Sequence, residues 1–181
     1  MSILVFAGSL RKDSLNKKLA RIVAKEIKEK NFEVELIELN NFEMPIYDGD
    51  IEEKGFPEKV MEFREKFEKA EGVFIITPEY NFSIPGGLKN IIDWLSRKKN
   101  LMDSKVIAIG GASNGRFGTI RVQTHFKEIL LLLNAKIIGY PSLLIVNGNS
   151  AFDSEGNLVN ENDVKAMKKL VEVFLQQIKK D

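Results

Sequence analysis

Five short apolar runs alternate along this chain with longer amphipathic stretches, and this alternation limits the possible folds more than any other feature of the sequence. The run Gly-Val-Phe-Ile-Ile at 72–76, for example, is too short for a helix and rich in β-branched residues. Successive βα units of this kind build a mostly parallel sheet with helices on both faces. We expect strands at 3–7, 33–37, 72–77, 105–109 and 136–145, and helices at 15–30, 57–69, 87–97, 119–133 and 161–180.

The number and spacing of these units predict an α/β protein with a flavodoxin-like, doubly wound, five-stranded parallel sheet of order 2-1-3-4-5. In such a sheet, ligands bind at the carboxyl ends of the strands, at the switch point between strands one and three. The loops that begin at Gly8 and Pro78 should therefore form the site. The length of 181 residues suits one domain spanning 1–181, in which 41–55 is the only extended irregular stretch.

The composition favours small-molecule partners. The chain has 27 basic and 26 acidic residues in an interspersed pattern, so neither a nucleic acid nor a membrane surface is an expected partner. Because the chain contains no cysteine, redox chemistry would have to come from a bound cofactor rather than from thiols or iron-sulfur clusters. The first residues lack a basic segment followed by a long apolar run, and we expect a cytoplasmic protein.

The loop after the first expected strand suits an anion. It places Ser9, Arg11, Ser14 and Asn16 around the start of a helix, where free backbone N–H groups already attract negative charge. The alternative is that Ser14 only caps the helix and Gly8 only forms a tight turn.

Two lysines strengthen the case for a bound anion in this loop. Lys17 and Lys18 occupy the first helical turn, where the helix dipole disfavours cations, so that an anion would relieve an adverse arrangement. The loop lacks the second and third glycines of a dinucleotide-binding fingerprint, which favours a mononucleotide. A second glycine cluster at 110–118 is expected after strand four. It could supply backbone donors to the ligand, or it could be a flexible connection.

Several motifs occur in order along nearly the whole chain: Gly8-Ser9-Leu10-Arg11-Lys12-x-Ser14-x-Asn16, Pro45-Ile46-Tyr47-Asp48, the long segment from Thr77-Pro78-Glu79-Tyr80-Asn81 through Trp94 to Arg97, and the 110–118 loop. Together they resemble the NAD(P)H-dependent FMN reductase family, especially its chromate and quinone reductase branch. The resemblance implies noncovalently bound FMN. It places the phosphate on Ser9, Arg11, Ser14 and Asn16, and the isoalloxazine ring against Pro78, Glu79, Tyr80, Asn81 and Ser113.

The same resemblance implies a reaction. NAD(P)H would reduce the flavin and leave before an acceptor enters, which is a ping-pong reaction, and the acceptors would be quinones, azo compounds, free flavins or chromate. The cofactor carries this chemistry, so we expect no catalytic side chain. Glu79 is the tempting general acid or base, but its neighbours suggest that the backbone of this turn holds the pyrimidine edge of the ring.

Three other features need an interpretation. His125 is the only histidine and is expected in a surface or hydrogen-bonded role, because it cannot form a metal cluster alone. Trp94 is expected in the core or at a subunit interface. The run at 129–133 is apolar on all sides, which suggests a subunit interface, and the resemblance implies a homodimer or homotetramer with Tyr80, Phe82 and Trp94 near the flavin and the partner chain.

Other functions agree less well with the sequence. A flavodoxin-type electron carrier would share the fold and FMN without oxidising nicotinamides directly, but such carriers tend to be strongly acidic. A receiver-type signalling module needs an aspartate cluster where this chain has Gly8-Ser9 and Thr77-Pro78. An interaction domain without enzymatic activity would explain neither Arg11 nor the long motif.

Overall fold

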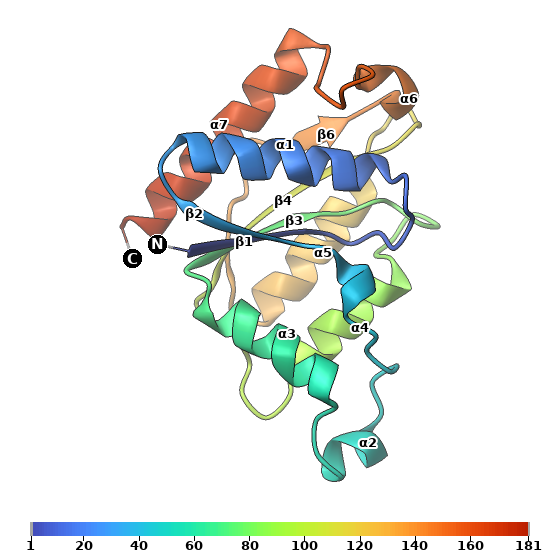
Figure 1. The fold of residues 1–181 in the computed structure, drawn as a ribbon, viewed down its shortest axis with the longest axis vertical. Coiled ribbons are helices and arrows are strands. Elements are labelled where there is room, and N and C mark those ends of the chain that lie inside the picture. Colours follow the sequence, from blue (N-terminus) through green and yellow to red (C-terminus); the bar gives the residue numbers. More distant parts are fainter. Residues whose placement is uncertain (1, 181) are drawn as a thin grey trace.

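The alternating apolar runs form a parallel sheet that lies between two layers of helices, as the computed structural model in Figure 1 shows. The structure describes residues 2–180. Its strands are β1 (Ser2–Ala7), β2 (Glu33–Ile37), β3 (Gly72–Ile76), β4 (Val106–Ala112), β5 (Lys136–Ile137) and β6 (Leu143–Ile145). Its helices are α1 (Leu15–Glu29), α2 (Gly49–Glu53), α3 (Glu58–Lys69), α4 (Gly86–Leu95), α5 (Ile120–Leu132), α6 (Gly148–Ala151) and α7 (Glu161–Ile178), with a short 3-10 helix at Leu39–Asn41.

The predicted strand order is confirmed. The strands β2, β1, β3, β4 and β5 lie side by side in that order, and every pairing is parallel. The expected count of five strands is wrong, because the stretch at 136–145 forms two short strands that both pair with β4. Gly139 and Pro141 lie between them and interrupt the ladder, since proline has no N–H to donate and glycine weakens a strand.

The strand β4 is longer than expected, which changes the interpretation of the second glycine cluster. Gly110 and Gly111 are buried strand residues that pair with β6, so the expectation that they open a loop is wrong. A Cβ atom on Gly111 would lie 2.3 Å from the carbonyl oxygen of Thr77 and 2.3 Å from Oγ1 of Thr119. Glycine is needed here because β3 and the start of α5 approach the strand closely, and the loop begins only at Ser113.

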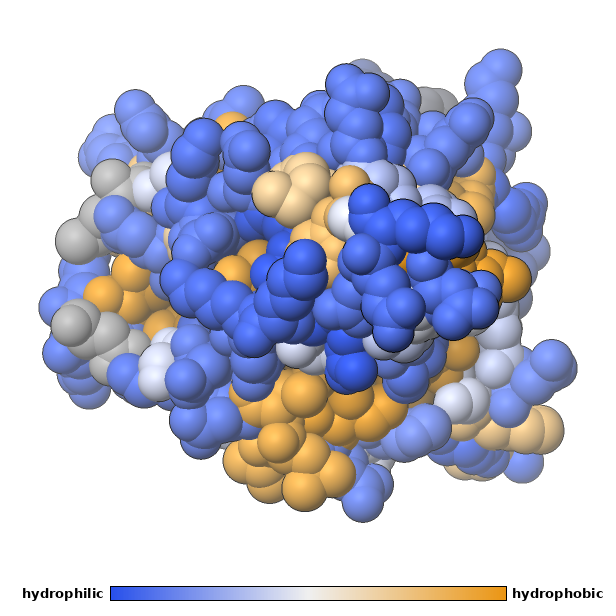
Figure 2. Space-filling model, turned by 90° about the horizontal axis from the view of Figure 1, so that it is seen from below, coloured by the Kyte–Doolittle hydropathy of each residue, from blue (hydrophilic) through white to orange (hydrophobic). Residues whose placement is uncertain are grey.

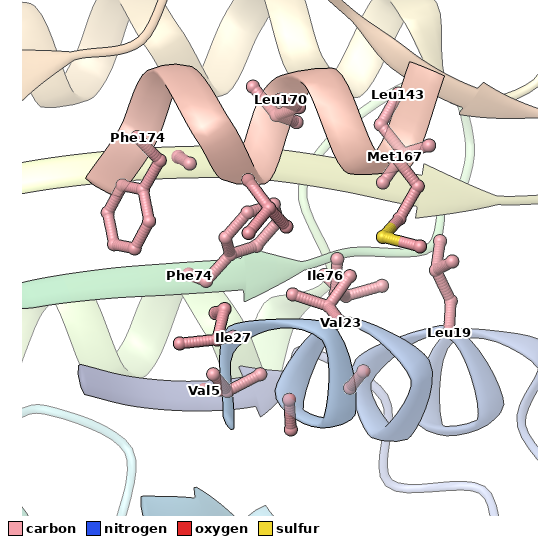
Figure 3. Close-up of a cluster of buried hydrophobic side chains, with 14 of the residues drawn as sticks. Val5, Leu19, Val23, Ile27, Phe74, Ile76, Leu143, Met167, Leu170 and Phe174 are labelled. Atoms are coloured by element: carbon pink, nitrogen blue, oxygen red, sulfur yellow. The ribbon is translucent and has the colours of Figure 1, made fainter. Parts of the chain in front are cut away.

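Successive side chains of each strand point to opposite faces of the sheet, which divides the core in two. On one face, buried residues of β1, β3, β4 and β6 pack against α1 and α7. Figure 3 shows this cluster, in which Phe74 and Ile76 of β3 lie between Val23 and Ile27 of α1 and Phe174 of α7. On the other face, the sheet packs against α3, α4 and α5. Burial on both faces explains why β1, β3 and β4 are continuous apolar runs, whereas the edge strand β2 is mostly exposed and carries Glu33 and Glu35.

The irregular segment between β2 and α3 is tied to α4 by hydrogen bonds. The carbonyl oxygen of Pro45 accepts from Nδ2 of Asn90 at 2.9 Å and from Nε1 of Trp94 at 2.8 Å. The N–H of Tyr47 donates to Oδ1 of Asn90 at 2.7 Å. Trp94 is fully buried and stacks edge to face on Tyr47, so it belongs to the core and not to a flavin or partner contact.

None of the helices in residues 2–180 combines the length and the apolar character that a membrane span requires.

Candidate functional site

Loops at the carboxyl ends of β1, β3 and β4 meet around a cavity of about 160 Å³, which we call the polar cavity because most of the side chains around it carry a polar group. Eight of the nine predicted site residues line it, and Asn81 is the exception. Its walls consist of Ser9, Arg11, Ser14, Leu15 and Asn16 from the first loop and α1, Pro78, Glu79 and Tyr80 from the second loop, and Ala112, Ser113 and Asn114 from the end of β4. The switch point of the sheet therefore gathers side chains that are far apart in the sequence.

The loop after β1 offers hydrogen-bond donors that have no partner. No backbone N–H from Ser9 to Ser14 donates a hydrogen bond to another residue in the described part of the chain. The Ser9 side chain is almost fully enclosed, with 1% of the residue exposed, and its hydroxyl has no partner within residues 2–180. Ser9 and Ser14 are buried whereas residues 10–13 are exposed, and a donor in a buried residue costs free energy unless a ligand or water satisfies it. With the N-terminus of α1 beside them, they suit an anion.

Ser14 and Asn16 also have structural roles. The hydroxyl of Ser14 accepts from the N–H of Asn16 at 3.2 Å, so the interpretation of Ser14 as a helix cap is confirmed. The Asn16 side chain donates to the carbonyl oxygen of Ala112 at 3.0 Å and accepts from its N–H at 2.8 Å. Asn16 thus joins the start of α1 to the end of β4, and Ser14 and Asn16 both line the polar cavity.

The interpretation of Lys17 and Lys18 as cations that need a bound anion is wrong. Lys17 Nζ lies 2.8 Å from a carboxylate oxygen of Glu38 and 2.6 Å from Oδ1 of Asn40. Burial raises the pKa of Glu38, but the hydrogen bonds and charges of the cations beside it outweigh that effect, and the pKa lies below its usual value. Lys18 Nζ lies 5.9 Å from the centre of the Phe152 ring. Both lysines are therefore accommodated by the protein itself.

A tight turn follows β3 and positions Tyr80. The backbone N–H and C=O groups of Tyr80 and Ser83 exchange hydrogen bonds of 3.1 and 3.0 Å. The two central residues, Asn81 and Phe82, have φ angles of 47° and 65°. Asparagine tolerates this left-handed region, whereas a bulky aromatic residue there is strained, and such strain is typically found at functional sites. The turn leaves Tyr80 about half exposed beside the polar cavity.

Glu79 caps a helix from outside that helix. Its carboxylate accepts hydrogen bonds from the N–H groups of Arg121 at 3.1 Å and Val122 at 3.2 Å, in the first turn of α5. The guanidinium of Arg121 adds an ion pair at 3.4 Å. Thr119, the residue before α5, makes no capping hydrogen bond with its side chain. The Glu79 carboxylate is therefore committed to holding the β3 loop against α5.

We expect Glu79→Ala to lower the free energy of unfolding by about 1 kcal/mol, because a helix loses its cap and an anion at its positive end. The melting temperature should fall by roughly 2–4 °C. Glu79→Gln should lose less, since an amide oxygen can still accept a hydrogen bond. Glu128→Ala, at an exposed position of the same helix, is the matched control. A Glu79→Gln variant that melts normally but has lost all turnover would contradict this role and indicate a general acid or base.

The loop after β4 is shaped by Ser113. Its hydroxyl donates to the carbonyl oxygen of Gly118 at 2.8 Å and accepts from the N–H of Gly115 at 3.2 Å. Asn114, which the sequence did not single out, lines the polar cavity and accepts from the N–H of Asn149 at 2.9 Å. Leu15, Ala112 and Asn114 were all missed, yet each adjoins a predicted site residue or the expected strand end, and that adjacency is the signal that could have found them.

His125 is exposed, and its Nδ1 lies 2.8 Å from the hydroxyl of Ser83, just after the strained turn. The expected surface and hydrogen-bonded role is confirmed. Among residues 2–180 there is no group of three or more acidic, histidine or cysteine side chains that could hold a metal ion.

A second cavity, of about 240 Å³, lies beside the first and is mostly apolar; we call it the apolar cavity. It shares Arg11 and Tyr80 with the polar cavity. The Arg11 side chain is exposed and makes no ion pair or hydrogen bond within the described residues. The remaining walls are Gly8, Leu10, Leu39, Phe42, Met44, Pro85, Gly86, Gly87, Asn90 and Ile91.

Comparisons with known proteins identify relatives of this chain in sequence and in fold. The family model described as NADPH-dependent FMN reductase matches residues 1–150. A 2-hydroxy-1,4-benzoquinone reductase of Burkholderia sp is 34% identical over 176 residues, which cover 96% of this chain and 94% of that protein. A quinone reductase of Escherichia coli is 40% identical over 146 residues, covering 80% and 77%. Among solved structures, the flavoenzyme NAD(P)H:(acceptor) oxidoreductase FerB of Paracoccus denitrificans superposes with a TM-score of 0.87 at 33% identity, covering 99% of this chain and 97% of that one.

Proposed function

The chain belongs to the NADPH-dependent FMN reductase family, and from this membership we propose that it passes electrons from NAD(P)H to quinones through noncovalently bound FMN. Azo compounds, free flavins and chromate are further acceptors in this proposal. The order of the reaction is ping-pong, with the oxidised nicotinamide leaving before the acceptor enters. A reaction that consumes NAD(P)H also favours the cytoplasm as its location.

The unpaired donors of the β1 loop carry this proposal. A flavin phosphate is a compact anion that needs several donors and a nearby positive charge. The loop supplies the enclosed hydroxyl of Ser9, together with N–H groups and the Arg11 guanidinium that have no partner within residues 2–180. We assign the phosphate to Ser9, Arg11, Ser14 and Asn16. We assign the isoalloxazine ring to the walls of the polar cavity that follow β3 and β4, formed by Pro78, Glu79, Tyr80 and Ser113, and to the neighbouring Asn81.

Bound FMN supplies the hydride chemistry, and the chain binds and orients it. The N–H groups of Glu79 and Asn81 donate no hydrogen bond within residues 2–180, so they are free to meet the pyrimidine edge of the ring. The hydrogen bonds of the tight turn and the contact of Glu79 with α5 hold these N–H dipoles in place, where fixed donors favour negative charge on the ring edge. No side chain acts as a general acid or base.

We also propose that the protein is a homodimer or homotetramer. Leu131 and Leu132 at the end of α5 are 67% and 81% exposed, and Phe82 in the tight turn is 71% exposed. Hydrophobic side chains also gather near the lower edge of the otherwise mostly hydrophilic surface in Figure 2. Exposed apolar surface of this kind is typical of subunit contacts. Light scattering after gel filtration should give twice or four times the chain mass of 20.5 kDa, and a monomer would contradict the proposal.

The direct test of the function is the visible spectrum. The purified protein, supplied with FMN, should show flavin absorption bands that bleach on anaerobic addition of NADH or NADPH and return when a quinone is added. Bands that neither nicotinamide bleaches would favour a flavodoxin-type electron carrier. If no flavin binds, the cofactor site is wrong.

A further inference from the structure

The apolar cavity adjoins the flavin site and shares only Arg11 and Tyr80 with it. We propose that it binds the ring system of the quinone acceptor, and that Phe42 and Met44 determine which quinones fit. This inference rests on the proposed function, because an acceptor site has meaning only in an enzyme that reduces an acceptor. It adds a location for the acceptor and the side chains that select it.

The two cavities adjoin each other. Arg11 and Tyr80 line both cavities, so a ligand in one cavity lies next to a ligand in the other. Tyr80 is half exposed between them and offers an aromatic ring against which a planar molecule can pack. Electron transfer needs this proximity of cofactor and acceptor.

The walls of the apolar cavity suit a quinone better than a nicotinamide. Leu10, Leu39, Phe42, Met44, Pro85 and Ile91 give the cavity an apolar lining. Its one side-chain amide, on Asn90, already donates to the carbonyl oxygen of Pro45 and accepts from the N–H of Tyr47. Nicotinamide and adenine carry amide or amino groups that would lose hydrogen bonds to water here. A quinone has no N–H donor, and its two carbonyl oxygens leave the faces of the ring apolar.

The apolar cavity, of about 240 Å³, has a rigid wall. The wall at Phe42 and Met44 is fixed on both sides. Phe42 packs edge to face on Phe63 with ring centres 5.2 Å apart, and Pro45 is held by the hydrogen bonds from α4. A preformed cavity avoids the entropic cost of ordering the wall on binding.

The balance of the reaction needs no further reactant. Reduction of a quinone to its hydroquinone consumes two electrons and two protons. The hydride from NAD(P)H supplies both electrons and one proton, and water supplies the second proton. The apolar cavity therefore has to orient the ring, and no lining side chain has to titrate.

The test compares two tryptophan variants of the FMN-loaded enzyme with 1,4-naphthoquinone as the probe. Met44→Trp fills the apolar cavity, whereas Ile46→Trp adds the same bulk two residues later, at a position that is 84% exposed and lines neither cavity. We expect Met44→Trp to weaken naphthoquinone binding to the oxidised enzyme by about tenfold or more in calorimetric titration, with a matching rise in KM. We expect Ile46→Trp to bind as the natural sequence does.

Two further measurements separate cavity filling from general damage. Ferricyanide is an inorganic oxidant that gains nothing from apolar walls, so the ratio of naphthoquinone to ferricyanide turnover should fall in Met44→Trp. Met44→Ala enlarges the cavity instead, and it should raise kcat/KM for naphthoquinone relative to 1,4-benzoquinone. This second variant keeps the proposal testable if Met44→Trp does not fold.

Equal naphthoquinone affinities of Met44→Trp and Ile46→Trp would overturn the proposal. So would a Met44→Trp protein that folds but no longer binds FMN, because the cavity would then hold the flavin itself. Failure of the proposed function has a different signature: the natural enzyme would not be bleached by NAD(P)H, whatever its affinity for naphthoquinone.

Discussion

A Gly111→Ala variant is expected to melt roughly 6–12 °C below the natural protein and to bind FMN more weakly. The added Cβ would lie 2.3 Å from both the Thr77 carbonyl oxygen and Oγ1 of Thr119, and the first of these contacts is with backbone that cannot rotate away. Overpacking of this kind costs about 3 kcal/mol, and each kcal/mol lowers the melting temperature of a chain this long by roughly 2–4 °C. Because Thr77 precedes the turn of Pro78 to Tyr80, relief of the clash displaces that wall of the polar cavity.

Gly115→Ala is the matched control for this substitution. Gly115 lies four residues later, in the loop beside the polar cavity, and the nearest atom to its added Cβ would be Ser113 Oγ at 3.6 Å, an ordinary contact. Scanning calorimetry and FMN titration of both variants check the expectation. If the two variants have the same melting temperature, the close approach of β3 and β4 does not require a glycine at position 111.

The sequence located the polar cavity because its signals are local. Ser9, Arg11 and Pro78 follow directly after apolar strands, and parallel strands bring their carboxyl ends to the same edge of the sheet. Alternating runs also predicted the strand order, since each connection carries a helix. These inferences depend on chemistry within a few residues, which a single sequence displays.

What the sequence did not reveal depends on residues that are far apart in the chain. From its own helix alone, Lys17 is expected to be an unpaired cation. The fold brings it to two partners more than 20 positions away, an ion pair with Glu38 and a hydrogen bond to Asn40. From the sequence, Glu79 is expected to be a free carboxylate beside the flavin. In the structure it accepts a hydrogen bond from the N–H of Arg121 in α5, 42 positions later. Such contacts depend on how helices and loops pack in the folded chain, and local propensity does not predict them.

Gly110 and Gly111 were misread for a related reason. Glycine is rare in strand interiors because it has no side chain to pack, so two glycines after an apolar run are typical of a loop. Here their lack of a side chain is what permits a buried strand, since Leu143 crowds the first glycine and Thr77 and Thr119 crowd the second. The division of the last expected strand into β5 and β6 was not predicted, because the apolar residues on both sides of Gly139 and Pro141 suggested one continuous strand.

Arg11→Ala is expected to weaken FMN binding by about 10- to 100-fold while leaving the melting temperature of the FMN-free protein unchanged. A charge-assisted hydrogen bond is worth about 1.5–3 kcal/mol, and each 1.4 kcal/mol is a tenfold change in affinity. Stability should not change, because the exposed side chain contacts no charged or polar partner within the described residues. Fluorescence titration of the FMN-free protein measures the affinity.

Riboflavin separates a phosphate contact from every other role of Arg11, because it lacks only the phosphate. If Arg11 holds the phosphate, Arg11→Ala should bind riboflavin as well as the natural protein does and should lose only its preference for FMN. The neighbouring Lys12→Ala removes the same charge from an exposed residue that lines neither cavity. It should keep both affinities, since a charge outside the site is screened by salt. Equal losses of FMN affinity in the two variants would mean that the loop attracts the anion by its overall charge, and the contact assigned to Arg11 would be wrong.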